Sequence, residues 1–376
     1  MIRLLHLADV HLGASFSAFG DLAAARRSDV VDAFRRLPEL AAAEDAHAVA
    51  IAGDLFDGPD PPAEVLVAAR EAVRRVVDAG HPVFVIPGNH DAITLHPNPW
   101  RESMGGAHVF TEPAFGEPVS VDTAGGPLHV YGIAYDAARE PDPLAGFSRA
   151  DAPGVHVVLL HGAVRDAPHW ATAPGALRLE PESLARLEAD YIALGDYHRH
   201  RPPAEFDAGG AVPACYVGSF AALDLTEAGP RGYVIAEVEE GRPPAVRLAP
   251  SGVTPVADIG DFDVSPYASD AEVADAVAER VPGEAIPVAR LVGTPAFPLD
   301  ADAVRAALVE RFGHVGMEDA SRYYAAGRLD ELAEEDTVIG HVVRIGRRRI
   351  DEAADEKARD VAEHALRLAL SALEVH

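Results

Sequence analysis

The sequence contains one cysteine, Cys215, and one lysine, Lys357, among its 376 residues. A single cysteine excludes an internal disulfide and any metal site built from several thiolates. A metal ion in this protein must therefore be held by His, Asp, Glu or Asn side chains. No stretch reaches the roughly 18 consecutive apolar residues that a membrane-spanning helix needs, and residues 1–6 lead directly into an apolar run rather than a signal peptide. We expect a cytoplasmic protein that does not contact a membrane.

Positive charge is also scarce. The chain carries 32 basic and 60 acidic side chains, for a formal net charge of −28 at pH 7. Because proteins hold nucleic-acid phosphates mainly through Lys and Arg, this balance argues against a sequence-independent DNA clamp formed by this chain alone. Arginines do cluster in places, but such clusters are more often solvated helix faces or turns than binding sites. They are residues 26–27, 35–36, 74–75, 199 with 201, and 347–349.

Apolar residues make up 48% of the chain, which is enough for a large domain with one or two smaller units. Up to about residue 250, short apolar runs alternate with helical patterns, and this alternation predicts an α/β core. The longer helical patterns cover residues 24–46 and 61–79. The apolar runs predicted to be strands are residues 2–8, 48–52, 82–86, 128–134, 155–160, 191–194, 215–217 and 233–238.

The composition changes around residues 250–266, where Gly, Pro, Asp and Ser predict a linker. Beyond it, residues 288–293 and 337–345 are predicted strands and residues 300–312 a predicted helix, which together indicate a small α/β unit. The predicted domains are residues 1–250 for the main domain, 251–349 for the linker and small α/β domain, and 350–376 for a C-terminal helix.

The C-terminal segment 352–373 contains no Gly or Pro. Val361, Ala365, Leu368 and Ala372 recur in it at helical spacing, which is typical of an amphipathic helix. Its apolar stripe has two interpretations of equal weight: it packs on its own domain, or it docks on a partner.

Polar side chains with metal-binding chemistry follow the predicted strands. Asp9, Asp54, Asn89, His161 and Asp196 each lie one to three residues from the end of an apolar run. In α/β sheets, ligands bind outside the carboxyl ends of strands, so these segments are expected to converge on one rim. Taken singly, each short polar motif could be an ordinary turn or a helix cap. Their recurrence after successive strands favours a shared site.

These side chains suit hard or borderline divalent ions such as manganese, iron or zinc. Two ions about 3.5 to 4 Å apart, with a carboxylate between them, can orient a hydroxide and neutralise charge on a phosphoryl group. This chemistry needs no Ser or Cys nucleophile. His90, next to Asp91, is a candidate for protonating the leaving oxygen, with the carboxylate fixing the ring. The sequence lacks a Gly-x-x-x-x-Gly-Lys-Ser/Thr loop, so the chain itself does not resemble a nucleotide-driven motor.

The motifs resemble the calcineurin-like metallophosphoesterase superfamily, whose pattern is Asp-x-His, Gly-Asp-x-x-Asp, Gly-Asn-His-Asp or Glu, a lone His, and Gly-His-x-His. Within it, residues 5–13 resemble the opening of SbcD-type DNA repair exonucleases, as do residues 216–219, 223–227 and 230–232. The resemblance covers roughly residues 1–250 and is faint beyond. It implies a four-layer α/β/β/α metallophosphoesterase sandwich with a small α/β capping domain and a C-terminal helix.

The resemblance also assigns roles by position. It implies that Asp9 and His11 bind a first metal ion, that Asn89 and His161 bind a second, and that Asp54 bridges both. His90 becomes the catalytic histidine, with Asp91 beside it.

The chain departs from the family pattern at Gly195-Asp196-Tyr197-His198. If the motif is anchored on Gly195, Asp196 takes the place of the first histidine and binds the second ion, while His198 binds the first. Sliding the motif by two residues uses His198 and His200 instead. We prefer the unshifted register because Gly195 directly follows the predicted strand and a carboxylate can replace an imidazole at such an ion.

The resemblance implies a manganese-dependent DNA exonuclease or endonuclease-like phosphodiesterase in DNA repair, working with an SMC-like ATPase of the SbcC type. Such a partner would supply the DNA contacts that an acidic chain lacks. Two alternatives stay open: hydrolysis of a non-DNA phosphoester, and an inactive scaffold. The stretch around Gly218-Ser219 argues against the first, and the metal-competent side chain at every site position argues against the second. The sequence leaves a homodimer open.

Overall fold

Two β-sheets packed face to face form the centre of residues 1–255, the first of two units into which the chain divides; the second is residues 256–376. The computed structural model describes residues 1–136, 144, 146–164, 177–206, 212–295, 297, 299–321 and 326–374. Among these residues, no helix combines the length and the apolar character that crossing a membrane requires.

The first sheet has a parallel centre. β1 pairs in parallel with β2, and β2 with β3, so the carboxyl ends of these three strands lie at one edge. β12 extends the sheet antiparallel to β1. In spatial order the strands are β13 (Ala245–Pro250), β12 (Gly232–Val238), β1 (Ile2–Leu7), β2 (Ala48–Ala52), β3 (Val83–Ile86) and β4 (His108–Val109).

The second sheet is also parallel except at one edge. β10 pairs in parallel with β11 and β7, and β7 with β6, whereas β5 is antiparallel to β6. In spatial order its strands are β11 (Ala214–Tyr216), β10 (Tyr191–Gly195), β7 (Val155–His161), β6 (Gly126–Gly132) and β5 (Val119–Thr123). The short strands β8 (Ala163–Val164) and β9 (Arg178–Leu179) pair separately.

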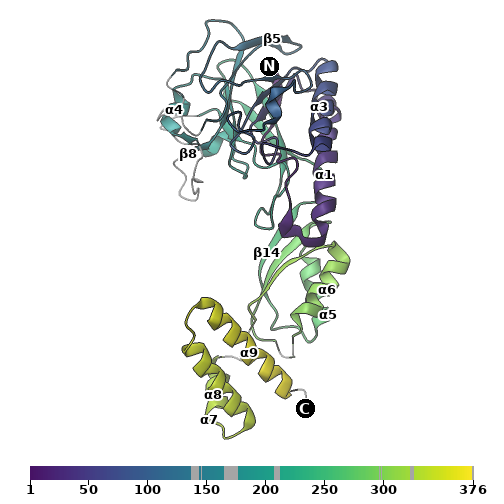
Figure 1. Cartoon of the computed structure of the whole chain (residues 1–376), viewed down its shortest axis with the longest axis vertical. Helices are drawn as coiled ribbons and strands as arrows, with labels where there is room; N and C mark the ends of the chain where they lie inside the picture. The colour runs from purple at the N-terminus through teal and green to yellow at the C-terminus, as the bar shows by residue number, and fades with distance from the viewer. Residues whose placement is uncertain are drawn as a thin grey trace. The chain divides into compact units, whose positions relative to one another are not determined.

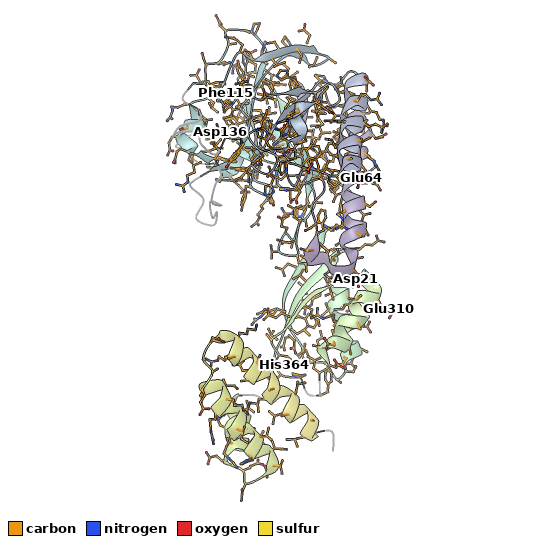
Figure 2. The ribbon with its side chains drawn as sticks, viewed as in Figure 1. Asp21, Glu64, Phe115, Asp136, Glu310 and His364 are labelled. Carbon is orange, nitrogen blue, oxygen red and sulfur yellow. The ribbon has the colours of Figure 1, made fainter. Side chains whose placement is uncertain are left out.

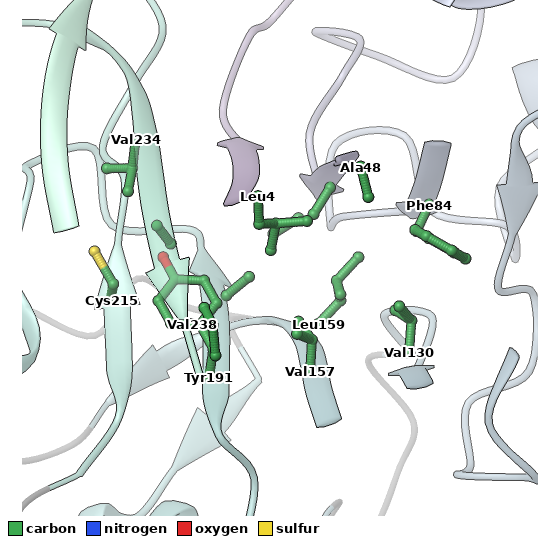
Figure 3. Packing of buried hydrophobic residues seen from close by; sticks show 14 of the residues in the cluster. Leu4, Ala48, Phe84, Val130, Val157, Leu159, Tyr191, Cys215, Val234 and Val238 are labelled. Carbon is green, nitrogen blue, oxygen red and sulfur yellow. The ribbon is translucent and has the colours of Figure 1, made fainter. Parts of the chain in front are cut away.

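A hydrophobic core fills the space between the sheets. Leu4 and Ala48 of the first sheet face Val157 and Leu159 of the second (Figure 3). Successive side chains of a strand point to opposite faces, so Leu159 lies in this core while Leu160 packs on the outer face of the second sheet. This shared core places the carboxyl ends of strands from both sheets at a common rim.

Helices complete the sandwich on both sides. α1 (Ala23–Arg35), α2 (Leu37–Ala43) and α3 (Ala63–Asp78) pack against one another beside the first sheet, where α1 and α3 run side by side (Figure 1). α4 (Pro181–Ala185) packs on the outer face of the second sheet through Leu184. The mixed α/β architecture agrees with the predicted fold class. The single helix predicted at residues 24–46 is interrupted at Arg36, next to the Leu37-Pro38 start of α2.

The second unit begins with a parallel sheet of β14 (Val256–Asp263), β15 (Ile286–Val292) and β16 (Gly316–Asp319). α5 (Asp270–Glu279) and α6 (Ala301–Phe312) bury their apolar sides in its core. Both helices begin at a capping side chain, Ser269 for α5 and Asp300 for α6. The predicted linker is therefore wrong over residues 256–263, which form β14 despite their Gly and Asp content.

The end of the chain is helical. α7 (Ala326–Glu334), α8 (Val338–Asp351) and α9 (Glu356–Glu374) share a small core that includes Leu332, Val343 and Leu366. The predicted strand at residues 337–345 is wrong: its β-branched residues lie in α8, which Thr337 caps by accepting a hydrogen bond from the Gly340 N–H. Packing against α7 and α9 outweighs the weak strand preference of these residues. The helix predicted at residues 352–373 is confirmed as α9.

The acidic side chains that dominate the composition lie on the surfaces of both units. Asp21, Glu64 and Glu310, labelled in Figure 2, are all exposed. Any anion therefore approaches a negatively charged molecule, which makes the local chemistry of a binding site decisive.

Candidate metal centre

The predicted site residues meet at the rim where strands of both sheets end. Asp9, Asp54 and Asn89 follow β1, β2 and β3 of the first sheet. His161 ends β7, and Asp196 directly follows β10 of the second sheet. Because these strands are parallel within each sheet, their carboxyl ends deliver side chains that are far apart in sequence to one place.

Asp54 lies between two histidines. Its Oδ2 atom is 3.6 Å from His11 Nε2 and 3.4 Å from His161 Nε2. His161 Nε2 is also 2.9 Å from Asn89 Oδ1 and 3.8 Å from Asp196 Oδ1. One carboxylate thus faces ring nitrogens contributed by both sheets.

His11 and His90 are both oriented by Asp57. The Nδ1 atom of His11 lies 3.1 Å from Asp57 Oδ1, and the Nδ1 atom of His90 lies 3.0 Å from the Asp57 carbonyl oxygen. Both partners are acceptors, so the proton of each neutral ring resides on Nδ1 and the lone pair on Nε2. The two rings are in edge-on contact, with centroids 4.7 Å apart.

His161 and His198 are anchored in the same way. His161 Nδ1 donates to the carbonyl oxygen of Ala52 at 2.9 Å, and His198 Nδ1 donates to Glu227 Oε1 at 2.6 Å. In each of the site's histidines the Nε2 atom is therefore the one left for an ion or a substrate.

The donor atoms fit divalent cations. Asp9, His11 and His198 offer ligand atoms that all lie within 4.8 Å of one another, and so do Asp9, Asp54 and His161. The buried Nε2 atom of His11 has no hydrogen-bond partner among the described residues. A buried acceptor of this kind is costly unless an ion or ordered water uses it. The Asp and His donors are those that manganese, iron and zinc accept.

The backbone at the site adopts uncommon conformations. Asp9, His11 and Asp54 have φ values of 49°, 50° and 49°, and Asp196 has a φ of 95°. Left-handed backbone is unfavourable for residues other than glycine, and such strain clusters at functional sites. The tight turns after the strands direct these side chains into the rim.

Two glycines leave room for the donor side chains. A Cβ atom at Gly53, where φ is +91°, would lie 2.1 Å from His161 Nδ1. A Cβ atom at Gly88 would lie 2.1 Å from Asp54 Oδ1. The glycines of the Gly-Asp and Gly-Asn motifs are thus required because the two sheets bring a histidine and a carboxylate against the backbone.

Burial disfavours the charged form of the carboxylates in the site. It raises the pKa of the Asp9 carboxyl and that of Asp196. Burial acts in the same direction on Asp54, but the adjacent His161 ring outweighs it and holds the pKa of Asp54 below its usual range. Burial opposes the charged form of His161, yet Asp54, Asp9 and Asp196 raise the pKa of that ring well above its usual value. This cluster of carboxylates is stabilised by positive charge, which divalent ions supply.

Asp91 does not fix the ring of His90, contrary to the prediction. Its carboxylate oxygens accept hydrogen bonds from the backbone N–H groups of Gly88 at 2.8 Å and Phe56 at 3.1 Å. Asp91 is fully buried, and burial raises its pKa to about 7. It joins the loops after β2 and β3, and the atom that orients His90 is the Asp57 carbonyl oxygen.

The geometry favours Asp196 over His200 as the residue that completes the site. Asp196 Oδ1 lies 3.8 Å from His161 Nε2, and the Asp196 N–H donates to Asp9 Oδ1 at 3.0 Å. His200 Nδ1 instead donates to the carbonyl oxygen of Tyr216 at 2.9 Å. Neither Asp196 nor His200 belongs to a candidate ligand group in the described part of the chain, so the preference rests on these contacts.

We expect Asp196→Asn to weaken binding of a divalent metal ion, with manganese as the probe, by at least about tenfold and His200→Gln to leave metal binding unchanged. Asparagine tolerates the positive φ at position 196, so the backbone is preserved. Bound manganese is measured by equilibrium dialysis and mass spectrometry. Full occupancy in Asp196→Asn together with loss of an ion in His200→Gln would favour the shifted register.

Sequence reasoning did not assign a role to Asp57 or Glu227. Asp57 is the second aspartate of Gly-Asp-x-x-Asp, and this pattern was the signal available for it. Glu227 lies 29 residues after His198, beyond the reach of any local spacing rule. Only the folded chain brings its carboxylate to the ring.

A sandwich of two sheets with Asp, His and Asn side chains gathered at its rim defines a metal-dependent hydrolase of phosphate esters. Residues 2–200 match the family model described as calcineurin-like phosphoesterase, and the chain belongs to that family.

Curated relatives of the chain include phosphoesterases and nucleases. The uncharacterized metallophosphoesterase YhaO of Bacillus subtilis (strain 168) is 27% identical over 64% of this chain and 58% of its own length. The DNA double-strand break repair protein Mre11 of Sulfurisphaera tokodaii is 27% identical over 53% of this chain and 49% of its own. The D component of the nuclease SbcCD of B. subtilis is 30% identical over 61% and 64%. The matches thus span about half to two thirds of these relatives.

Proposed function

We propose that this protein is a manganese-dependent nuclease that hydrolyses DNA phosphodiester bonds in repair. The observation that carries the proposal is the pair of ligand groups that share Asp9, with Asp54 between the histidines of the two groups. The choice of DNA is supported by relatives named as a component of a nuclease and as DNA double-strand break repair proteins.

In this proposal Asp9, His11 and His198 hold a first ion, Asn89, His161 and Asp196 hold a second, and Asp54 lies between them. When bound, the two ions supply a hydroxide nucleophile at neutral pH and neutralise the charge that develops on the phosphoryl group. The hydrogen bonds at Nδ1 of His11, His161 and His198 fix the orientation of each ring with Nε2 free to bind an ion. The rings therefore need to move little when ions bind.

His90 is proposed to move the proton. Its Nδ1 is engaged by the Asp57 carbonyl oxygen, which leaves Nε2 to face the substrate, and its side chain is exposed at the rim. Because Nε2 of the neutral ring carries a lone pair, it must first take up a proton to form the imidazolium. When the phosphorus–oxygen bond breaks, that proton passes to the leaving oxygen and the ring returns to its neutral form. The reaction consumes one water and yields an alcohol and a phosphomonoester.

Because its surface is acidic, the chain needs a partner to bind DNA. With a net charge of −28, the chain alone is expected to bind duplex weakly at physiological salt. We propose that an SMC-like ATPase of the SbcC type contributes most of the phosphate contacts. The relative from the SbcCD nuclease is named as one of that enzyme's subunits, which supports a partner of this kind.

α9 offers a surface for that partner. Its intramolecular core uses Leu366 and Leu370, whereas Val361 and Leu368 are 63% and 60% exposed. Ala365 and Ala372 are exposed on the same helix. The apolar stripe of Val361, Ala365, Leu368 and Ala372 is therefore not buried by other parts of the described chain. This exposure supports docking on a partner.

One assay tests both the DNA substrate and the ATPase partner. The full chain, with manganese, is offered linear duplex DNA, single-stranded DNA and bis-p-nitrophenyl phosphate, each with and without the candidate ATPase. We expect turnover of the small ester by the chain alone and strong stimulation of DNA cleavage by the partner. Turnover of the small ester only, even with the partner present, would show that DNA is not the substrate; no turnover of any ester would favour a scaffold.

A matched variant separates docking from chemistry. Leu368→Glu introduces a charge into the exposed stripe and is expected to abolish stimulation by the ATPase while leaving hydrolysis of the small ester unchanged. Leu95→Glu, at a partly exposed leucine in the first unit, serves as the control. Full stimulation of Leu368→Glu would place the docking surface elsewhere.

A further inference from the structure

Behind His198 lies a partly buried hydrogen-bond network centred on Glu227. Glu227 Oε1 accepts from His198 Nδ1 at 2.6 Å. Its other oxygen, Oε2, accepts from the Ser219 hydroxyl at 2.9 Å and from the backbone N–H of Leu223 at 3.0 Å. The Glu227 side chain is 14% exposed and Ser219 is fully buried, so water competes little for these bonds.

Arg231 donates two further hydrogen bonds to this network. Its NH1 group donates to Ser219 Oγ at 3.2 Å, and its Nε donates to the backbone carbonyl of Glu227 at 3.3 Å. Glu227 is therefore held at its carboxylate and at its backbone. A carboxylate held at so many points has little freedom to leave the histidine ring.

The same loop also fixes backbone at the site. The Ser219 N–H donates to the His198 carbonyl at 3.0 Å, and the Phe220 N–H donates to the Asp9 carbonyl at 3.2 Å. Gly218, with φ +84°, makes this approach possible, since a Cβ atom there would lie 3.0 Å from the His198 carbonyl oxygen. Two candidate ligands of the first ion thus depend on one loop.

The carboxylate determines how His198 presents its ring. An ionised carboxylate only accepts, so in the neutral, metal-binding form of the ring Nδ1 carries the proton and Nε2 the lone pair. His11, the other histidine of that ligand group, has a carboxylate at Nδ1 as well, from Asp57. His161 has only a backbone carbonyl there. Carboxylate–histidine pairs of this kind fix ring orientation and strengthen the imidazole as a ligand.

We infer that Glu227 is a positioning residue for His198 and through it sets the affinity of the first metal site, with Ser219 and Arg231 holding Glu227 in place. The inference rests on the proposed assignment of His198 to that ion. It gives a physical role to residues 216–219, 223–227 and 230–232, which mark the resemblance to the nuclease branch but contain no proposed ligand.

Titration of the full chain with manganese, followed by calorimetry and by electron paramagnetic resonance of free Mn²⁺, tests this role. Glu227→Gln keeps the size of the side chain and removes its charge. We expect it to weaken the first site by about 10- to 100-fold and to leave the second within about twofold. The control Glu239→Gln makes the same change at a surface glutamate paired with Arg242 and is expected to bind both ions as the wild type does.

A double-mutant cycle separates positioning from a general effect on the loop. In a His198→Ala background, Glu227→Gln is expected to cause no further loss of affinity, because its influence passes through the ring. An equal loss with and without His198 would overturn the inference, as would unchanged binding by Glu227→Gln alone.

Ser219→Ala gives a second test that does not depend on whether Glu227→Gln folds. It removes the bond to Glu227 Oε2 and the acceptor of Arg231 NH1 without changing charge. We expect a smaller weakening of the same site in a metal-free protein that still unfolds cooperatively. If Glu227→Gln does not fold, wild-type affinity in Ser219→Ala overturns the inference. Failure of the proposed function is distinct: a wild type that binds two ions but cleaves no DNA refutes the nuclease, and one that binds fewer than two refutes the site assignment.

Discussion

Replacing Asp54 with asparagine is expected to lower phosphodiester hydrolysis by about 10³-fold or more and to weaken binding of both manganese ions. Asp54 Oδ2 lies 3.6 Å from His11 Nε2 and 3.4 Å from His161 Nε2, in position to serve both groups. A neutral amide cannot replace a carboxylate between two cations. Charge stabilisation by the ions contributes several kcal/mol to such reactions, and each 1.36 kcal/mol is about tenfold in rate.

Folding is expected to survive this substitution. The asparagine side chain retains an oxygen that can accept a hydrogen bond from the backbone N–H of His90, as Asp54 Oδ1 does at 2.9 Å. Asp78→Asn, at an exposed residue of α3 paired with Arg74, is the matched control and should behave as the wild type. Metal content is measured by dialysis and rate with bis-p-nitrophenyl phosphate. Two tightly bound ions and substantial activity in Asp54→Asn would contradict the bridging assignment.

Replacing His90 with glutamine is expected to reduce hydrolysis by about 10²- to 10⁴-fold while both ions stay bound, because a general acid typically contributes a factor of this size. Glutamine can occupy much of the ring's volume but cannot deliver a proton at neutral pH. The His90 side chain is exposed at the rim, so its loss should leave the fold intact.

Rate and metal content must be measured on the same preparation. The loss should be larger for esters with poor leaving groups than for bis-p-nitrophenyl phosphate, whose leaving group needs little protonation. His81→Gln, a histidine of the loop between α3 and β3, is the control. Loss of a metal ion from His90→Gln would show that this histidine is a ligand.

The central strands of the two large sheets were predictable from the sequence, whereas edge strands such as β5 and β13 were not predicted. β2 is a continuous apolar run, and β1 and β7 are mostly apolar, because both faces of a strand at the centre of this sandwich are buried. α8 was not predictable in this way. Its Val and Ile residues have a strand-like composition, and only packing against α7 and α9 selects the helix.

The candidate ligands were predictable because each lies directly after a strand that the sequence reveals. Chemistry, position after a strand and order along the chain suffice for Asp9, Asp54, Asn89 and His161, which the fold places together. The orientation of the rings was not predictable. The sequence predicted that Asp91, adjacent to His90, would orient the His90 ring. Its carboxylate oxygens instead accept hydrogen bonds from the backbone N–H groups of Gly88 and Phe56.

The candidate donor set could be predicted from the sequence, because metal chemistry restricts which side chains can serve and a strand end restricts where they lie. Tertiary structure alone decided which acceptor holds each Nδ1 atom: Asp57 for His11 and His90, Ala52 for His161 and Glu227 for His198. These partners are joined by loops that the packing of two sheets brings together, and a hydrogen bond of about 3 Å depends on that packing rather than on any local pattern.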